Sequence, residues 1–157
     1  MRKLIPAFVT SLLAMTSFVV HADHDQADLK ALLDELEVNR RLVVEENMNL
    51  ASGDDDNEKF WSTYDRYRKE IGELSLEGMM LLEEFRQHFE EISDERAQEI
   101  LRSYLLREQE RLDIKQRYIG QFNEVITARQ TLRFYQIDNK LDVIIESDVS
   151  SVTPLVP

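Results

Sequence analysis

The chain has 157 residues, of which 31 are acidic and 19 are Lys or Arg, so its formal net charge is −12. An acidic balance of this size argues against nucleic acid or an anionic membrane surface as a partner, because both would repel the protein. The sequence contains no Cys, which excludes disulfides, thiol chemistry and thiolate metal sites.

Residues 1–22 follow the three-part pattern of a secretory signal peptide. Arg2 and Lys3 are basic, an apolar run extends from Leu4 to Val20, and Ala22 offers a small residue for the processing protease. We expect cleavage after Ala22, which removes two positive charges and takes the formal net charge from −12 to −14. No stable membrane anchor then remains. The pattern favours the bacterial periplasm, with full secretion as the alternative.

Residues 23–146 are predicted to form one helical domain, because this stretch has no Pro and only four Gly. The first helix is predicted from Gln26 to Leu50 and is followed by a polar, acidic turn at residues 52–58. Arg40 interrupts its apolar seam, whose other members recur at intervals of three and four residues: Leu29, Leu32, Leu33, Leu36, Val43 and Leu50.

The second helix, predicted from Glu58 to Ile92, has the clearest periodicity in the chain. At 1.5 Å per residue it would be a rod of about 50 Å, which cannot bury its seam on itself, so other helices must lie along it. The seam follows a heptad pattern without a slip: Phe60, Tyr64, Tyr67, Ile71, Leu74, Gly78, Leu81, Phe85, His88 and Ile92.

Ser93 is the predicted N-cap of a third long helix, with Asp94 and Glu95 in its first turn. Two polar residues, Glu108 and Lys115, lie on its apolar seam. They mark either the point where the helix leaves the core or a device that sets the register between packed helices. The seam is predicted to contain Ala97, Leu101, Leu105, Glu108, Leu112, Lys115, Ile119, Phe122 and Ile126, widened by Ile100, Tyr104, Tyr118 and Val125.

A fourth helix is predicted to begin after Thr127 and to end near Glu146, before a disordered tail at residues 147–157. Its apolar face is predicted to contain Phe134, Ile137, Leu141, Ile144 and Ile145. The expected fold is therefore all-α, an elongated antiparallel hairpin or bundle of about four helices, three of them long, with a coiled-coil-like seam. The seam is satisfied either within one chain or across a homodimer.

The residues Ile126-Thr127-Ala128-Arg129-Gln130 have a structural and a functional interpretation. Structurally, Thr127 caps the fourth helix and Gln130 bonds back to the amide of the cap, which together form a capping box. The same residues fit the LTxxQ-type signature through Ile126, Thr127 and Gln130, and here the chain resembles the Spy/CpxP-like periplasmic stress proteins. A weaker match to the same signature lies at residues 92–96, where Arg96 occupies the position of Gln.

This resemblance implies a cradle-shaped helical dimer that binds unfolded clients without ATP or restrains an envelope-stress sensor. Under it, the aromatic cluster that opens the second helix is a candidate surface for clients or a partner. Aromatic residues at helical spacing also form cores or dimer seams, because their rings contribute a large buried area. The cluster contains Phe60, Trp61, Tyr64 and Tyr67.

Glu84, His88 and Glu91 are close in sequence on the second helix and form a candidate zinc site. The alternative is that His88 packs at the edge of the seam beside Phe89, since three ligands of this type leave the coordination shell of zinc incomplete. No cofactor motif is present, and no nucleophile, glycine-rich phosphate loop or paired-histidine motif suggests an enzyme.

These features favour a periplasmic, ATP-independent chaperone-like protein or envelope-stress adaptor whose partners are protein clients or an envelope protein. A structural coiled-coil partner of one envelope protein and a periplasmic zinc-binding protein are the alternatives.

Overall fold

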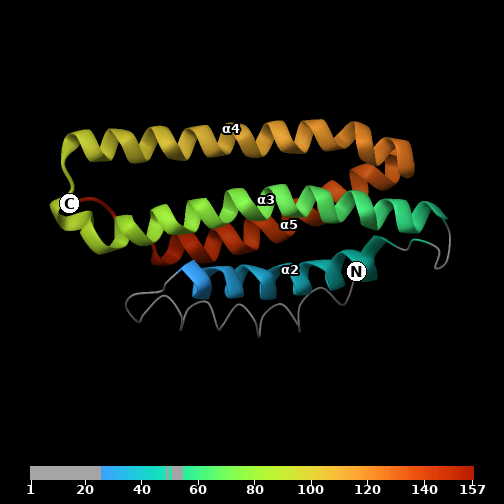
Figure 1. Ribbon diagram of the computed structural model, residues 1–157, viewed down its shortest axis with the longest axis horizontal. Coiled ribbons are helices and arrows are strands. Elements are labelled where there is room, and N and C mark those ends of the chain that lie inside the picture. Colours follow the sequence, from blue (N-terminus) through green and yellow to red (C-terminus); the bar gives the residue numbers. More distant parts are fainter. Residues whose placement is uncertain (1–25, 49, 51–54) are drawn as a thin grey trace. The chain divides into compact units, whose positions relative to one another are not determined.

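The computed structural model describes residues 26–48, 50 and 55–157. The predicted signal peptide and its cleavage site therefore lie outside the described residues. The described part of the chain is helical and contains no strand, which confirms the predicted all-α fold (Figure 1). Its elements are α2 (Gln26–Met48), α3 (Asp55–His88), the short 3-10 helix η1 (Phe89–Glu91), α4 (Asp94–Val125) and α5 (Ala128–Val152).

Contacts divide these helices into two compact units. One contains α2 and the greater part of α5, from Leu132 to Thr153, and the other contains α3, η1, α4 and the first turn of α5. The residues predicted as one helical domain are thus organised as two helix pairs. None of the described helices combines the length and the apolar character needed to span a bilayer.

In the second unit, α3 and α4 run antiparallel and lie side by side (Figure 1). The first half of the predicted α3 seam is buried, as Phe60, Tyr64, Tyr67, Ile71 and Leu74 show. The reversal of the chain occurs at η1. Ser93 then caps α4 as predicted, because its Oγ accepts a hydrogen bond from the backbone N–H of Arg96 at 3.2 Å.

In the first unit, the apolar seam of α2 is buried together with residues of α5. The buried apolar residues are Leu29, Leu32, Leu36, Val44 and Met48 on α2, and Phe134 and Leu141 on α5. Leu33 and Val43, both predicted for this seam, are only half-buried. Arg133 of α5 donates from Nε to the carbonyl of Asn47 at 2.6 Å. This satisfies a carbonyl at the C-terminus of α2 and places positive charge where the helix dipole favours it.

The C-terminal segment differs from the prediction. Residues 147–152 are helical, so α5 ends at Val152 and not near Glu146. Two side chains bond to backbone oxygens of this last stretch: Ser151 Oγ donates to Asp148 O at 2.7 Å, and Thr153 Oγ1 donates to Val149 O at 2.8 Å. The helix stops just before Pro154, whose ring disfavours the helical conformation in the preceding residue.

Candidate protein-binding surface on α4

Aromatic packing fixes which side of α4 faces α3. Tyr118 and Phe122 of α4 are buried, together with Ile114. The ring centroid of Phe122 lies 5.6 Å from that of Phe60, and the ring centroid of Tyr118 lies 5.4 Å from that of Tyr67. Such aromatic pairs contribute a large buried area and a preferred ring geometry. The aromatic side of α4 is therefore its inner face.

Glu70 of α3 holds this orientation through polar contacts. Tyr118 donates its hydroxyl proton to Glu70 Oε1 at 2.7 Å, and Arg117 pairs with Glu70 Oε2. Burial of the Tyr118 hydroxyl and its bond to the Glu70 carboxylate raise the pKa of Tyr118 to about 12. The phenol therefore stays protonated at neutral pH and keeps donating to Glu70.

The predicted seam of the third helix is buried only toward its C-terminal end, where Phe122 and Ile126 lie. Four aliphatic members of the seam are instead exposed, namely Leu101 (58% exposed), Leu105 (57%), Leu112 (48%) and Ile119 (43%), and we call these four residues the outer stripe. At about 100° per residue, the outer stripe lies roughly 110° around α4 from the inner face. Because α4 carries two apolar stripes and the aromatic one is buried against α3, the aliphatic one faces outward.

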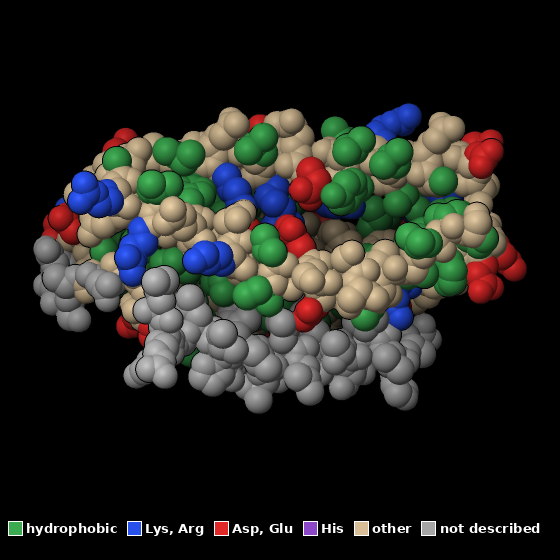
Figure 2. All heavy atoms as spheres, turned by 180° about the vertical axis from the view of Figure 1, so that it is seen from behind, with side chains coloured by type: hydrophobic (Ala, Val, Ile, Leu, Met, Phe, Trp, Pro, Cys, Tyr) green, Lys and Arg blue, Asp and Glu red, His purple; other side chains and the backbone are tan. Residues whose placement is uncertain are grey.

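Charged residues are few along the outer stripe. Glu108 and Lys115 occupy the polar positions of the repeat, and Glu108 also makes an ion pair with Arg111 at 3.9 Å. One border of the stripe has exposed, uncharged amides at Gln98, Gln109, Gln116 and Asn123. Hydrophobic side chains appear at several points along the upper band of Figure 2, where α4 runs. Several exposed aliphatic residues on one side of a helix make that side a candidate interaction site.

The predicted capping box is present at the start of α5. The backbone N–H of Thr127 donates to Gln130 Oε1 at 3.0 Å, and the backbone N–H of Gln130 donates to Thr127 Oγ1 at 3.3 Å. Ile126 is buried at the end of α4. The three residues of the signature thus form the junction between two helices, and both polar side chains are used within the chain.

The aromatic cluster of α3 belongs to the core. Phe60, Tyr64 and Tyr67 are at most 2% exposed, and Trp61 is half-buried with its ring 5.0 Å from that of Phe60. A client could not contact the three buried rings while the unit stays folded. This burial corrects the interpretation of the cluster as a binding patch and agrees with its alternative interpretation as a core.

The candidate zinc ligands are not brought together. The carboxylate of Glu84 pairs with Arg96, and His88 bonds through Nδ1 to the backbone oxygen of Glu84 at 3.0 Å. Glu91 lies beyond the end of α3, in η1. Over the part of the chain that the structure describes, no three His, Cys, Asp or Glu side chains are grouped to hold a metal ion. The zinc interpretation is therefore corrected.

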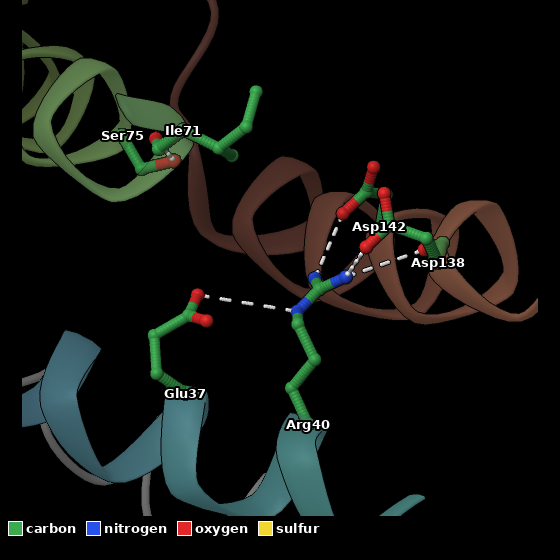
Figure 3. A network of polar contacts seen from close by, with 6 residues as sticks. All are labelled: Glu37, Arg40, Ile71, Ser75, Asp138 and Asp142. Atoms are coloured by element: carbon green, nitrogen blue, oxygen red, sulfur yellow. Dashed lines mark hydrogen bonds and ion pairs between the residues drawn. The ribbon is translucent and has the colours of Figure 1, made fainter. Parts of the chain in front are cut away.

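Sequence reasoning missed a buried ionic network in the first unit (Figure 3). Arg40 donates from Nη1 to Asp138 Oδ1 at 2.6 Å and from Nη2 to Asp142 Oδ1 at 2.7 Å, and its Nε lies 4.0 Å from Glu37 Oε1. Arg40 is 2% exposed, Asp138 0% and Asp142 7%. The sequence does contain a signal for this network. Arg40 is the single Arg in the apolar seam of the first predicted helix, and Asp138 and Asp142 lie four residues apart on the apolar face of the fourth. The network joins α2 to α5 and has no evident chemical role.

Comparisons of the chain with protein-family models, with curated proteins and with solved structures find no match.

Proposed function

We propose that this protein is a periplasmic, ATP-independent chaperone-like protein or envelope-stress adaptor that binds other proteins through the outer stripe of α4. The exposure of Leu101, Leu105, Leu112 and Ile119 on one side of one helix is the observation that carries the proposal. Aliphatic side chains kept in water contribute nothing to the fold, and each becomes favourable when a partner covers it.

Two features of the sequence support the same proposal. The first 22 residues have the pattern of an export signal. The residues Ile126 to Gln130 resemble the LTxxQ-type signature of the Spy/CpxP-like proteins. The signature would act through the capping box, since Thr127 and Gln130 bond to each other and hold the start of α5.

A dedicated coiled-coil partner is the second candidate, and the spacing of the outer stripe favours it. Leu101, Leu105, Leu112 and Ile119 occupy a heptad repeat with Glu108 and Lys115 between them. This is the pattern by which one helix packs along another. A dedicated partner would present one complementary helix, whereas a chaperone would bind many unrelated chains.

Light scattering of an aggregating client tests the proposal. An unfolding secretory protein is mixed with the purified protein at about equal molar ratio, without ATP. We expect scattering to be suppressed by the native sequence and restored in large part by the double variant Leu105→Gln/Leu112→Gln, because the amides remove the apolar contact. The matched control is Val38→Gln/Leu42→Gln, which removes two exposed aliphatic residues from α2 and should leave suppression unchanged.

Each outcome decides between the candidates. Equal loss in both double variants would mean that exposed apolar residues anywhere suffice, and would remove the special role of α4. Unchanged scattering with a helical, folded sample would end the chaperone proposal and leave the dedicated partner. Several unrelated clients should be compared, because suppression of one client only also points to a dedicated partner.

A further inference from the structure

We propose that Arg111 of α4, together with Arg107, which lies against Gly78 of α3, binds a carboxylate of a partner protein. The site makes the protein prefer segments in which an acidic residue accompanies apolar ones. That the carboxylate belongs to a protein rests on the function proposed above, whereas the anion site itself rests on contacts within the pair of α3 and α4.

The inner face of α4 is closed near the C-terminus of the helix and open farther from it. Tyr118 and Phe122 are buried on this face. At about 100° per residue, Arg107 and Arg111 lie on the same side of the helix, but both are only half-buried. Tyr104, one turn before Arg107, is 52% exposed. A segment of another protein can therefore reach the two guanidiniums from solvent.

Ion pairs join α3 and α4 on either side of this opening. Arg96 of α4 pairs with Glu84 of α3, and Arg117 of α4 pairs with Glu70 of α3. These two contacts show how an arginine of α4 is neutralised where α3 offers an acid opposite to it.

Arg107 and Arg111 have no such acid on α3. Arg107 forms no ion pair and no hydrogen bond with any residue that the structure describes. Among the same residues, Arg111 forms an ion pair only with Glu108 of its own helix, whose Oε1 lies 3.9 Å from Nε of Arg111. This distance is too long for a hydrogen bond, and the Nε is buried without a hydrogen-bond partner. Because the chain has 31 acidic residues, the arrangement of the helices leaves these guanidiniums unsatisfied, and not a shortage of acids.

Gly78 makes room for Arg107 on α3. A Cβ built on this glycine would lie 3.5 Å from Nε of Arg107 and 3.9 Å from its Cδ. The neighbouring positions of the α3 seam have large apolar side chains, Leu74 and Leu81. The missing side chain at Gly78 therefore lets Arg107 stay between the helices, where packing of its stem restricts the motion of the guanidinium.

An external carboxylate fits these two arginines. A partly desolvated cation without a counter-ion is unfavourable, and like charges four residues apart on a helix repel each other. A bound carboxylate relieves both effects, because its oxygens accept charge-assisted hydrogen bonds from the planar fork of a guanidinium. The same chemistry suits a phosphate, so the source of the anion is decided by the rest of the molecule.

The net charge of the chain favours a protein as that source. At −12 the chain repels nucleic acid and anionic membranes, which present dense rows of phosphates. An acidic residue in a polypeptide brings a single charge, and its neighbours in the sequence can be apolar. The exposed ring of Tyr104, one turn before Arg107, offers such neighbours an apolar contact.

Binding of two matched peptides tests the proposal. Both are fluorescein-labelled, leucine-rich helical peptides of about 15 residues, and they differ only in a central Glu or Gln. Fluorescence anisotropy with the purified protein measures the two Kd values. We expect the Glu peptide to bind about tenfold more tightly than the Gln peptide, because only the carboxylate forms charge-assisted hydrogen bonds with the arginines.

The double variant Arg107→Gln/Arg111→Gln should abolish this preference, so that the ratio of the two Kd values falls from about ten to about one. The matched control is Arg102→Gln/Arg129→Gln, which removes two exposed arginines outside the opening and changes the net charge by the same amount. The control should keep the preference. Circular dichroism checks that each variant is helical.

Substitution of Gly78 tests the geometry without altering any charge. In Gly78→Leu the added side chain would occupy the place where Arg107 lies against α3, so the ratio should fall to about three or less. Gly78→Ala is its control, because a Cβ at 3.5 Å makes only an ordinary van der Waals contact and should leave the preference intact. An unchanged ratio in Gly78→Leu would overturn the role given to the position of Arg107.

Several other results would overturn the proposal. Equal binding of both peptides to the native protein would exclude the carboxylate site and leave the proposed function, since the apolar contacts would still hold. A preference for Glu that persists in Arg107→Gln/Arg111→Gln would place the carboxylate elsewhere. If neither peptide binds, the assignment to a protein is wrong, and the scattering of clients shows separately whether the proposed function survives.

Nuclear magnetic resonance distinguishes a carboxylate of a protein from a small anion. The native protein is titrated with glutarate or with inorganic phosphate, and the Nε–H resonances of Arg107 and Arg111 are followed after assignment with the single variants Arg107→Gln and Arg111→Gln. We expect both small anions to shift these resonances only at concentrations on the order of millimolar. Saturation by either one at about micromolar concentration would make a small anion the ligand and overturn the assignment to a protein.

Discussion

Arg40 lies among leucines on α2, with two aspartates of α5 as its ion-pair partners. Taking a guanidinium and two carboxylates out of water is costly, and the close contacts at 2.6 and 2.7 Å offset this cost only while every member is present. The arrangement specifies register, because a shift of α5 by one residue would move both carboxylates away from the guanidinium. At the scale of the residue, the first unit thus obtains specificity of pairing from this network and stability from the leucines around it.

Removal of Arg40 should therefore destabilise the protein strongly. We expect Arg40→Met to lower the free energy of unfolding by about 3–5 kcal/mol, because two buried carboxylates lose their cation. Urea unfolding followed by far-UV circular dichroism measures the change. The control is Lys30→Met, which breaks the exposed pair with Asp34 and should cost less than about 1 kcal/mol.

The triple variant Arg40→Met/Asp138→Leu/Asp142→Leu separates charge burial from packing. We expect it to recover most of the lost stability, since an apolar replacement of a buried ionic network is often neutral or stabilising. A triple variant as unstable as Arg40→Met would show that the polar contacts themselves hold α2 on α5.

At the scale of the element, periodicity predicted all four long helices, and it placed most of their ends within a few residues of the observed ones. The prediction succeeded because caps, recurring apolar residues and the absence of Pro act locally. The prediction failed where the packing of a side chain depends on a residue that is distant in the sequence. Nothing within α4 shows which of its two apolar stripes packs, because the choice is made by Phe60 and Tyr67 of α3. The partners of Arg40 lie 98 and 102 residues away along the chain, beyond any local pattern.

The same limit applied to the prediction of the candidate surface from the sequence. Its residues Leu101, Leu105, Leu112 and Ile119 were recognised from the sequence as part of a heptad seam, but the sequence left open whether that seam packs within the chain or against a second copy. The aromatic residues of α3 could be interpreted either as a surface or as a core, and the structure buries Phe60, Tyr64 and Tyr67. Spacing and residue type are visible in a sequence, whereas the direction in which a stripe faces is a property of the packed pair.

Glycine in the long helices offers a prediction at this scale. Gly120 lies within α4 with an exposed backbone, and a Cβ built on it would meet no atom within 4 Å. We expect Gly120→Ala to raise the free energy of unfolding by about 0.5–1 kcal/mol, because Ala loses less backbone entropy in a helix. Thermal unfolding followed by circular dichroism checks the change. A loss of stability would contradict the ordinary helical environment described for this position.

At the scale of the whole molecule, charge governs how copies of the chain meet. A formal net charge of −12 repels a second copy at distances that salt screens, from about 10 Å at 0.1 M to about 3 Å at 1 M. The apolar contacts of the outer stripe do not depend on that screening. Long-range repulsion therefore opposes the approach of other acidic proteins, whereas the outer stripe favours contact with a partner that has come close.

The pairing of α2 with α5 also sets the order in which the helices can pack while the chain is being synthesised. The chain is made from its N-terminus, so the leucines of α2 and the guanidinium of Arg40 emerge before Asp138 and Asp142, which follow Arg40 by 98 and 102 residues. The adjacent helices α3 and α4 can close their hairpin in between, since local contacts form sooner than distant ones. A nascent chain therefore carries α2 without its partner until α3, α4 and α5 have been made, and α2 is the segment on which a holding factor or a misfolding event would act in that interval.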